Sequence, residues 1–126
     1  MRYMMIVKSA EPTAPPSPEL MAAVGQMAQD MAQAGVLLDM GGLAPSARGA
    51  RIRVSKGTLA VLDGPFTETK ELIGGFAVLK AGSKSEAIEL GRRFMQMHVD
   101  VLGGDFTAEL EIREMADAPD ADAAGH

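Results

Sequence analysis

The chain has 126 residues, a length typical of one domain that buries enough surface to fold without a metal or a disulfide. It contains no cysteine, which excludes disulfides, thiolate metal sites and a cysteine nucleophile, and which leads us to expect a cytoplasmic protein. The net charge of −5, the aromatic content of 4% and the lack of any apolar run near roughly 20 residues disfavour nucleic-acid and membrane partners.

The first part of the chain predicts a strand, a helix and a second strand. Residues 3–7 are apolar throughout, as in a central strand, and the run is too short for a signal peptide because Lys8 closes it. After a proline-rich loop, Ser17 is placed to cap a helix that Gly35 ends. The apolar residues of this helix repeat at helical spacing: Leu20, Val24, Met27 and Met31. Residues 36–38 predict a short apolar strand.

The middle of the chain predicts a loop over 41–49 and then a hairpin. Residues 51–54 alternate polar and apolar side chains, as a half-buried strand does. A Lys-Gly turn at 56–57 leads into a second apolar strand over 58–62. The sequence Asp-Gly-Pro at 63–65 ends the hairpin.

The last part of the chain predicts a strand, a helix and a final strand. The first of these strands covers residues 75–80. Ser83 and Glu86 have the spacing of a capping box at the start of the helix. Its apolar face is formed by Ala87, Leu90, Phe94 and Met97. Residues 107–115 alternate apolar and charged side chains, which predicts a strand with one face in the core.

The order of these elements predicts an α+β domain, a ferredoxin-like βαββαβ pattern with an inserted hairpin. We expect residues 1–115 to form the domain and residues 116–126, rich in Ala and Asp, to be disordered. Two helices cover only one face of such a sheet, and the other face still carries apolar side chains. A homodimer that packs sheet on sheet is the simplest way to cover it.

The segment 63–76, DGPFTETKELIGGF, resembles the signature of the DGPF group within the YCII-related proteins. Residues 3–7, 34–38, 42–45 and 93–98 also resemble that group. The resemblance implies a dimeric α+β barrel, and it implies an association with extracytoplasmic-function sigma factors, to which some members are linked.

The YCII family includes members with a His and an Asp in or near the first helix, proposed as a catalytic pair. Counted from Gly35, these positions fall near Val24 and Gln33 in this chain, and neither side chain transfers a proton. The chemistry that the family resemblance implies is therefore not carried over.

Two candidate catalytic residues remain. Asp63 is either a turn residue that accepts backbone hydrogen bonds or a carboxylate at the mouth of a pocket. His98 is the one histidine before the C-terminal tail, and it is either a helix-end residue that complements the helix dipole or a general base. One histidine with scattered carboxylates does not predict a metal site.

Three further residues are candidates for ligand binding. Arg53 shares a strand face with Arg51, and the two either grip an anion or form an outward polar face. Glu68 and Lys70 either hold a substrate or lie in a solvated loop.

Two hypotheses on function stay open, and whether the chain is an enzyme is left undecided. In the first, a small molecule binds at the loop that follows Asp63, with or without catalysis. In the second, the chain is a non-catalytic regulatory or protein-interaction module. No nucleotide, flavin or metal motif is present, so we predict no cofactor. Convergence of Asp63, Lys70 and His98 on one cavity would favour the first hypothesis.

Overall fold

The computed structural model describes residues 1–11, 15–66 and 71–116. The described residues form an α+β fold with two sheets and two α-helices. In chain order the elements are β1 (Arg2–Ser9), α1 (Pro18–Gln33), β2 (Leu37–Gly42), the short 3-10 helix η1 (Ser46–Arg48), β3 (Ala50–Ser55), β4 (Thr58–Asp63), β5 (Leu72–Lys80), α2 (Lys84–Leu102) and β6 (Glu109–Glu114). Of the predicted disordered tail, 116–126, residues 117–126 lie outside the described residues.

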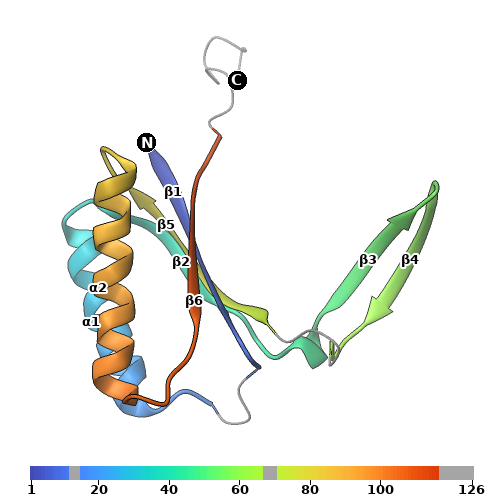
Figure 1. Cartoon of the computed structure of the whole chain (residues 1–126), viewed down its shortest axis with the longest axis horizontal. Helices are drawn as coiled ribbons and strands as arrows, with labels where there is room; N and C mark the ends of the chain where they lie inside the picture. The colour runs from blue at the N-terminus through green and yellow to red at the C-terminus, as the bar shows by residue number, and fades with distance from the viewer. Residues whose placement is uncertain (12–14, 67–70, 117–126) are drawn as a thin grey trace.

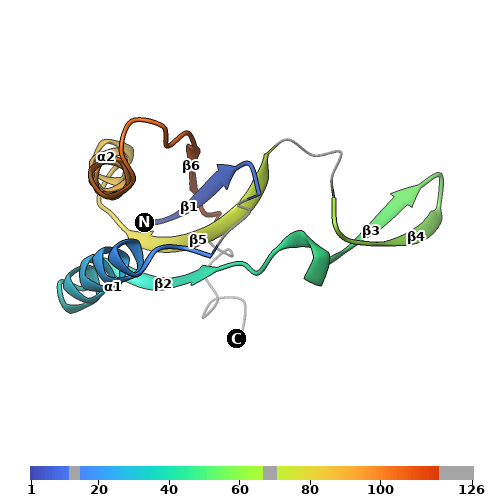
Figure 2. The same ribbon diagram turned by 90° about the horizontal axis from the view of Figure 1, so that it is seen from below.

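The larger sheet has the strand order β2-β5-β1-β6, and all neighbouring strands are antiparallel. Each helix joins two strands that flank a third: α1 crosses from β1 to β2 over β5, and α2 crosses from β5 to β6 over β1. This arrangement is consistent with the predicted ferredoxin-like fold. Both helices lie on the same face of the sheet (Figures 1 and 2).

The predicted helix boundaries are confirmed by the capping contacts. The Ser17 hydroxyl accepts a hydrogen bond from the Leu20 amide at 3.2 Å, and Gly35 follows α1 with a φ of 75°. At α2, Ser83 accepts from the Glu86 amide, and the Glu86 carboxylate accepts from the amide of Gly82. The capping box therefore reaches back one residue further than the usual pattern.

The core lies between the sheet and the two helices. Tyr3 and Met5 on β1 and Leu79 on β5 are 0–3% exposed. Gly91 lets α2 approach the sheet closely, because a Cβ there would lie 2.9 Å from the Ile112 Cδ1 atom. The buried face therefore follows the alternation of the strands, as the sequence predicts.

The other face of the larger sheet, which we call the open face, is covered by neither helix (Figure 2). Side chains alternate along a strand, so the neighbours of the buried residues point to this face. They are half-buried rather than buried. The half-buried apolar residues of the open face include Met4, Ile6, Phe76 and Val78.

The prediction of a loop over 41–49 is wrong at its start. Gly41 and Gly42 belong to β2 and pair with Phe76 and Gly75 of β5. The absence of a side chain at Gly41 makes room for Phe76, since a Cβ would lie 3.0 Å from its ring. The glycines that suggest a loop thus serve close packing within a strand.

The second sheet, β3 and β4, extends from the end of the larger sheet away from both helices (Figure 1). We call it the β3–β4 arm (Ala50–Asp63). Its turn is Lys56-Gly57, with φ values of 50° and 80°. The prediction that residues 51–54 are half-buried is wrong: Ile52 and Val54 are 68% and 67% exposed, because the arm projects away from the body.

Candidate functional site

A hydrogen-bonded junction holds the base of the arm. The Glu11 carboxylate accepts hydrogen bonds from both the backbone amide and the hydroxyl of Ser46, the latter at 2.8 Å. The Ser46 hydroxyl in turn accepts from the Phe66 amide at 3.1 Å. The Gly64 amide donates to the Gly49 carbonyl at 2.9 Å. These bonds connect the loop after β1, the helix η1 and the turn after β4, so the junction fixes where the arm leaves the body.

The Asp63–Phe66 turn, the most distinctive part of the sequence, is built into this junction. Gly64 lies so close to η1 that a Cβ would be 1.7 Å from the Ser46 carbonyl oxygen. The bond between Gly64 and Pro65 is cis. The Arg51 guanidinium lies 3.8 Å from the centroid of the Phe66 ring, a cation–π contact. The turn therefore has a clear structural role at the base of the arm.

Arg53 and Asp63 lie on the arm, on opposite faces of it. In the register of β3 and β4, Arg53 lies opposite Ala60 and Asp63 lies opposite Ala50, so Asp63 shares a face of the arm with Ala50 and not with Arg53. Because side chains alternate across a two-stranded ribbon, the two charged groups point to opposite sides. Both side chains are exposed. The structure thus does not bring these two candidates together.

Glu68 and Lys70, the other two loop candidates, lie outside the described residues. Nothing in the geometry around Asp63 therefore bears on them. The sequence-based expectation that they bind a ligand stays a prediction.

His98 lies on α2, within the helical layer (Figure 1), and is 9% exposed. Its ring contacts Phe94 at 4.6 Å between centroids and stacks on Phe106 at 5.5 Å. The Nδ1 atom is 2.9 Å from the Phe94 carbonyl oxygen, so Nδ1–H donates to that oxygen. The arm that carries Asp63 extends from the end of the sheet, away from α2 (Figure 1). His98 and Asp63 therefore do not belong to one site within a single chain.

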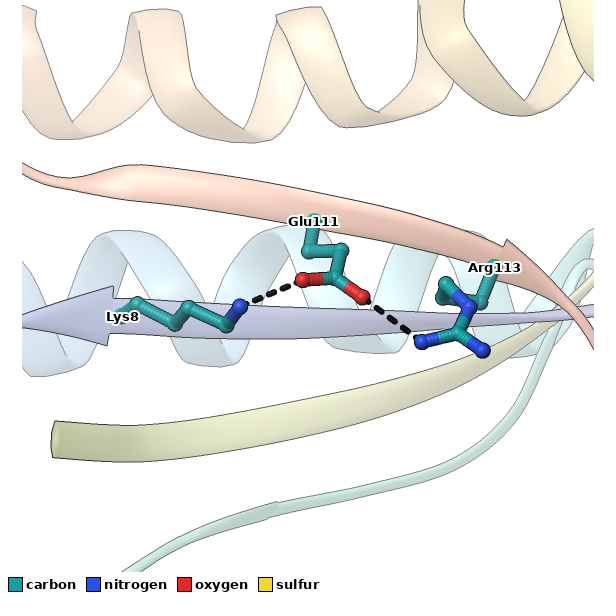
Figure 3. A network of polar contacts seen from close by, with 3 residues as sticks. All are labelled: Lys8, Glu111 and Arg113. Atoms are coloured by element: carbon teal, nitrogen blue, oxygen red, sulfur yellow. Dashed lines mark hydrogen bonds and ion pairs between the residues drawn. The ribbon is translucent and has the colours of Figure 1, made fainter.

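A charged network lies along the open face, on the strands β1 and β6 (Figure 3). Glu111 accepts hydrogen bonds from Lys8 and from Arg113, the latter at 3.1 Å. The hydrogen bonds from Lys8 and Arg113 lower the pKa of the Glu111 carboxyl. The hydrogen bond to Glu111 raises the pKa of Lys8.

A small apolar cavity lies between the helices and the sheet. Its volume is about 10 Å³, room for one water molecule at most, and its lining includes Met5, Met31 and Phe94. A surface depression of about 450 Å³ is lined by residues that include Lys80 and Glu86, and none of Arg53, Asp63 and His98 lines it. Among residues 1–11, 15–66 and 71–116, no three His, Asp or Glu side chains gather in a way that suits a metal ion.

Sequence reasoning missed the junction itself. Glu11 and Ser46 are 35 residues apart, and neither belongs to a recognisable motif. The only signal was the glycine at position 64, which is compatible with any tight turn. None of the helices in the described part of the chain has the length and apolar character of a membrane-spanning helix.

The fold and the placement of the candidates define a small α+β domain of ferredoxin-like type, without a clustered catalytic constellation in the described residues. A family model described as the YCII-related domain matches residues 1–116, so the chain belongs to the YCII-related family. An uncharacterized protein of Rhizobium meliloti is 40% identical over 60 residues. That alignment covers 48% of this chain and 48% of the relative, so the match spans about half the length of either protein.

Proposed function

We propose that this chain is a non-catalytic interaction module that works as a homodimer, with the open face of the larger sheet between the two copies. The observation that carries the proposal is the pair of apolar rows on that face, Met4 and Ile6 on β1 and Phe76 and Val78 on β5. They are half-buried, and neither helix lies across them (Figure 2). A sheet with apolar side chains on both faces is stable in water when both faces are covered.

Two such faces are able to cover each other. Sheets that pack face to face lie about 10 Å apart, with the side chains of both inner faces interdigitating. A two-fold axis makes the interface isologous: both copies contribute the same face, and the apolar rows of one copy contact the apolar rows of the other. The charges of Lys8, Glu111 and Arg113 lie beside the apolar rows, where they form a polar rim (Figure 3).

The placement of the candidate residues supports a non-catalytic role. Arg53 and Asp63 point to opposite sides of the arm, and His98 is packed between two aromatic rings. Acid–base catalysis needs groups within hydrogen-bond reach of one reacting atom. The Asp63–Phe66 turn packs against η1 and hydrogen-bonds to it at the junction, and this structural role accounts for its unusual sequence.

Sedimentation velocity over a range of concentrations tests the proposal. We expect the wild-type chain to sediment as a dimer and Ile6→Asp to sediment as a monomer, because a carboxylate at that position is desolvated in the interface. Met21→Asp is the matched control: Met21 is 63% exposed on α1, away from the open face, and its change leaves the dimer intact. A wild-type chain that stays monomeric at every concentration contradicts the proposal.

A small-molecule site at the Asp63–Phe66 turn is the second candidate function, and it is the role that we would assign if the chain belongs to the DGPF group. One observation favours it: the Asp63 carboxylate is exposed at the mouth of the junction, two residues before the Pro65–Phe66 pair. A thermal-shift screen against a metabolite panel, repeated with Asp63→Asn, tests this role. A ligand-induced shift that disappears in the variant, at an unchanged Tm of the free protein, supports a ligand site; a large fall in that Tm identifies a turn residue.

A sigma factor is the class of partner that the family resemblance suggests for an interaction module. Co-expression of the tagged chain with an extracytoplasmic-function sigma factor from the same genome tests this idea. A stable complex that survives gel filtration supports a regulatory role. Separate elution of the two proteins argues against it.

A further inference from the structure

The larger sheet has two edge strands, β2 and β6, and they differ in regularity. The pairing of β2 with β5 is interrupted by a register shift between Leu37 and Asp39, whereas β6 pairs with β1 without any shift. The sequence of β6 contains no proline. Bulges and prolines are devices that keep the edge of a sheet from pairing with another strand. Because β6 has neither, its outer edge is able to pair with a further strand.

The register of β6 with β1 shows which of its backbone groups face outward. The Met115 amide donates to the Arg2 carbonyl at 2.8 Å, and hydrogen-bonded pairs alternate with non-hydrogen-bonded pairs along an antiparallel ladder. Every second residue of β6 therefore turns its N–H and C=O groups away from β1: Leu110, Ile112 and Glu114. Among the residues that the structure describes, no strand pairs with β6 on that side. These outward groups are the donors and acceptors that an added strand needs.

The helix α2 carries an apolar row on the side of this edge. Gly91 faces β6, since a Cβ there would lie 2.9 Å from the Ile112 Cδ1 atom, and Phe94 faces the cavity under α1. At roughly 3.6 residues per turn, a second apolar row lies on the other side of Gly91 from Phe94. We call it the outer row of α2: Ile88, Met95, Val99 and Leu102. Three of these side chains are 39–43% exposed, and the fourth is half-buried.

The outer row defines one face of a strand that would pair with β6. The helix α2 packs on β6, and α1 packs on β2 at the other side of the sheet (Figure 2). The outer row therefore projects toward the space beyond β6, where an added strand would lie about 4.8 Å away. Side chains of that strand at every second position would point into the helical layer and cover the row. Apolar side chains fit these positions.

The charges of β6 define the other face of the added strand. Glu109, Glu111 and Arg113 alternate with the core residues of β6 and point to the open face. Glu111 accepts hydrogen bonds from Lys8 and Arg113. Glu109, by contrast, is an exposed carboxylate near the start of the strand. Opposite charges on neighbouring strands attract each other, so a basic side chain fits the position beside Glu109.

We propose that the edge of β6 binds an extended segment of a partner protein in which apolar and basic residues alternate. The backbone of the segment pairs with the outward groups of β6, its apolar side chains cover the outer row of α2, and its basic side chains lie beside Glu109. This inference rests on the proposed interaction role and names the chemistry of the partner. It does not rest on the homodimer, because the edge of β6 is a different surface from the apolar rows of the open face.

Peptide binding measured by fluorescence anisotropy tests the chemistry of the segment. The probe is a fluorescein-labelled peptide of alternating Val and Lys, long enough to span β6. A peptide of the same composition, with all Val before all Lys, is the control for general attraction to an acidic chain. We expect the alternating peptide alone to bind, and Val99→Asp to weaken its binding about 10-fold or more, because a carboxylate in an apolar contact loses its hydration. Met21→Asp on α1 should bind like the wild type.

A proline at position 114 tests the backbone pairing. Glu114→Pro removes an N–H that faces away from β1, and proline is tolerated on an edge strand where its nitrogen faces solvent. Glu114→Ala is the matched control: it loses the same carboxylate, which accepts from the Tyr3 hydroxyl at 3.3 Å, and keeps the N–H. We expect the proline variant to bind the alternating peptide about 3- to 10-fold more weakly than the alanine variant. Equal binding by the two variants overturns the proposed pairing.

Amide hydrogen exchange of the ¹⁵N-labelled chain, followed by NMR, locates the bound peptide. The amides of Leu110, Ile112 and Glu114 should exchange more slowly once the alternating peptide is bound, because they become hydrogen-bonded. The Glu111 amide already faces β1 and should change little. Slower exchange confined to residues 37–42 or 50–63 overturns the assignment to β6. Equal binding of the alternating and the block peptide, or no binding of either up to about 1 mM, overturns the inference as well.

Sedimentation velocity separates this inference from the proposed homodimer. If the wild-type chain stays monomeric yet Glu114→Pro weakens peptide binding, the homodimer is wrong and the β6 site stands. If Ile6→Asp abolishes a dimer while neither the proline at 114 nor Val99→Asp affects peptide binding, the β6 site is wrong and the homodimer stands. A peptide-free dimer that Glu114→Pro dissociates would show that a second copy occupies the edge of β6, and it would overturn the site for a partner segment.

Discussion

The strand β1 and the β3–β4 arm are both rich in apolar residues, yet they differ completely in burial. Tyr3 and Met5 on β1 are 3% and 2% exposed, whereas Val54 and Val61 on the arm are 67% and 70% exposed. The strand β1 lies in the centre of a sheet under two helices, and the arm is a ribbon that no helix covers (Figure 1). Alternation of side chains tells which residues share a face, but it does not tell what covers that face.

The comparison predicts very different costs for similar truncations. Leu79 is fully buried on β5, so Leu79→Ala should lower the free energy of unfolding by about 2–5 kcal/mol. Val61→Ala on the arm should change it by less than about 0.5 kcal/mol, provided that the chain is dilute enough to be monomeric. Urea denaturation followed by circular dichroism measures both. A loss at Val61 comparable to the loss at Leu79 would show that the arm packs on its own body.

Weakening the junction at the base of the arm should destabilise the arm much more than the body. Ser46→Ala removes the hydroxyl that donates to Glu11 and accepts from the Phe66 amide. We expect a loss of about 1–2 kcal/mol, together with faster amide hydrogen exchange within residues 50–63. The matched control is Ser55→Ala near the exposed tip of the arm.

Hydrogen exchange followed by mass spectrometry resolves the two regions. Exchange in β1 and β5 should stay as slow as in the wild-type chain. Unchanged exchange in the arm of Ser46→Ala would show that other contacts hold the arm in place. Equal acceleration in the arm and the body would show that the two unfold as one unit.

Much of the fold was predictable because its signals are local. The caps at Ser17 and Ser83, the positive φ at Gly35 and the turn at Lys56-Gly57 depend on a few consecutive residues. Alternation along the last strand correctly placed Leu110 and Ile112 in the core. The end of β2 was misplaced because Gly41 and Gly42 have the composition of a loop, whereas the close packing that requires glycine at these positions involves β5.

The candidate site was less predictable because its geometry depends on distant contacts. The sequence showed that Arg51 and Arg53 share a face, and the register confirms it. That Asp63 points to the opposite face follows only from the pairing of β3 with β4. The partnership of Glu11 with Ser46 has no signature in either segment, and the exposure of the arm depends on where the junction directs it.

The smallest expected effect concerns the charged network on the open face. Lys8 and Arg113 hold the pKa of the Glu111 carboxyl below its ordinary value, so the folded state favours the ionised form. The resulting stabilisation is complete above the ordinary carboxyl pKa of roughly 4.3 and is lost as the pH falls through the lowered pKa. Glu111→Gln should therefore lose less stability than the wild-type chain between pH of about 5 and 3.

Urea midpoints measured at small pH steps across this range test the prediction, at a concentration where both proteins are monomeric. Glu109→Gln is the matched control, because Glu109 is an exposed carboxylate on the same strand. Its acid dependence should follow that of the wild-type chain. The pair is part-exposed, so the difference at Glu111 should be small and should shrink further in high salt. Identical acid dependence of Glu111→Gln and the wild type would mean that Glu111 ionises equally in the folded and unfolded chain, and that the network contributes charge to the open face without stabilising the body.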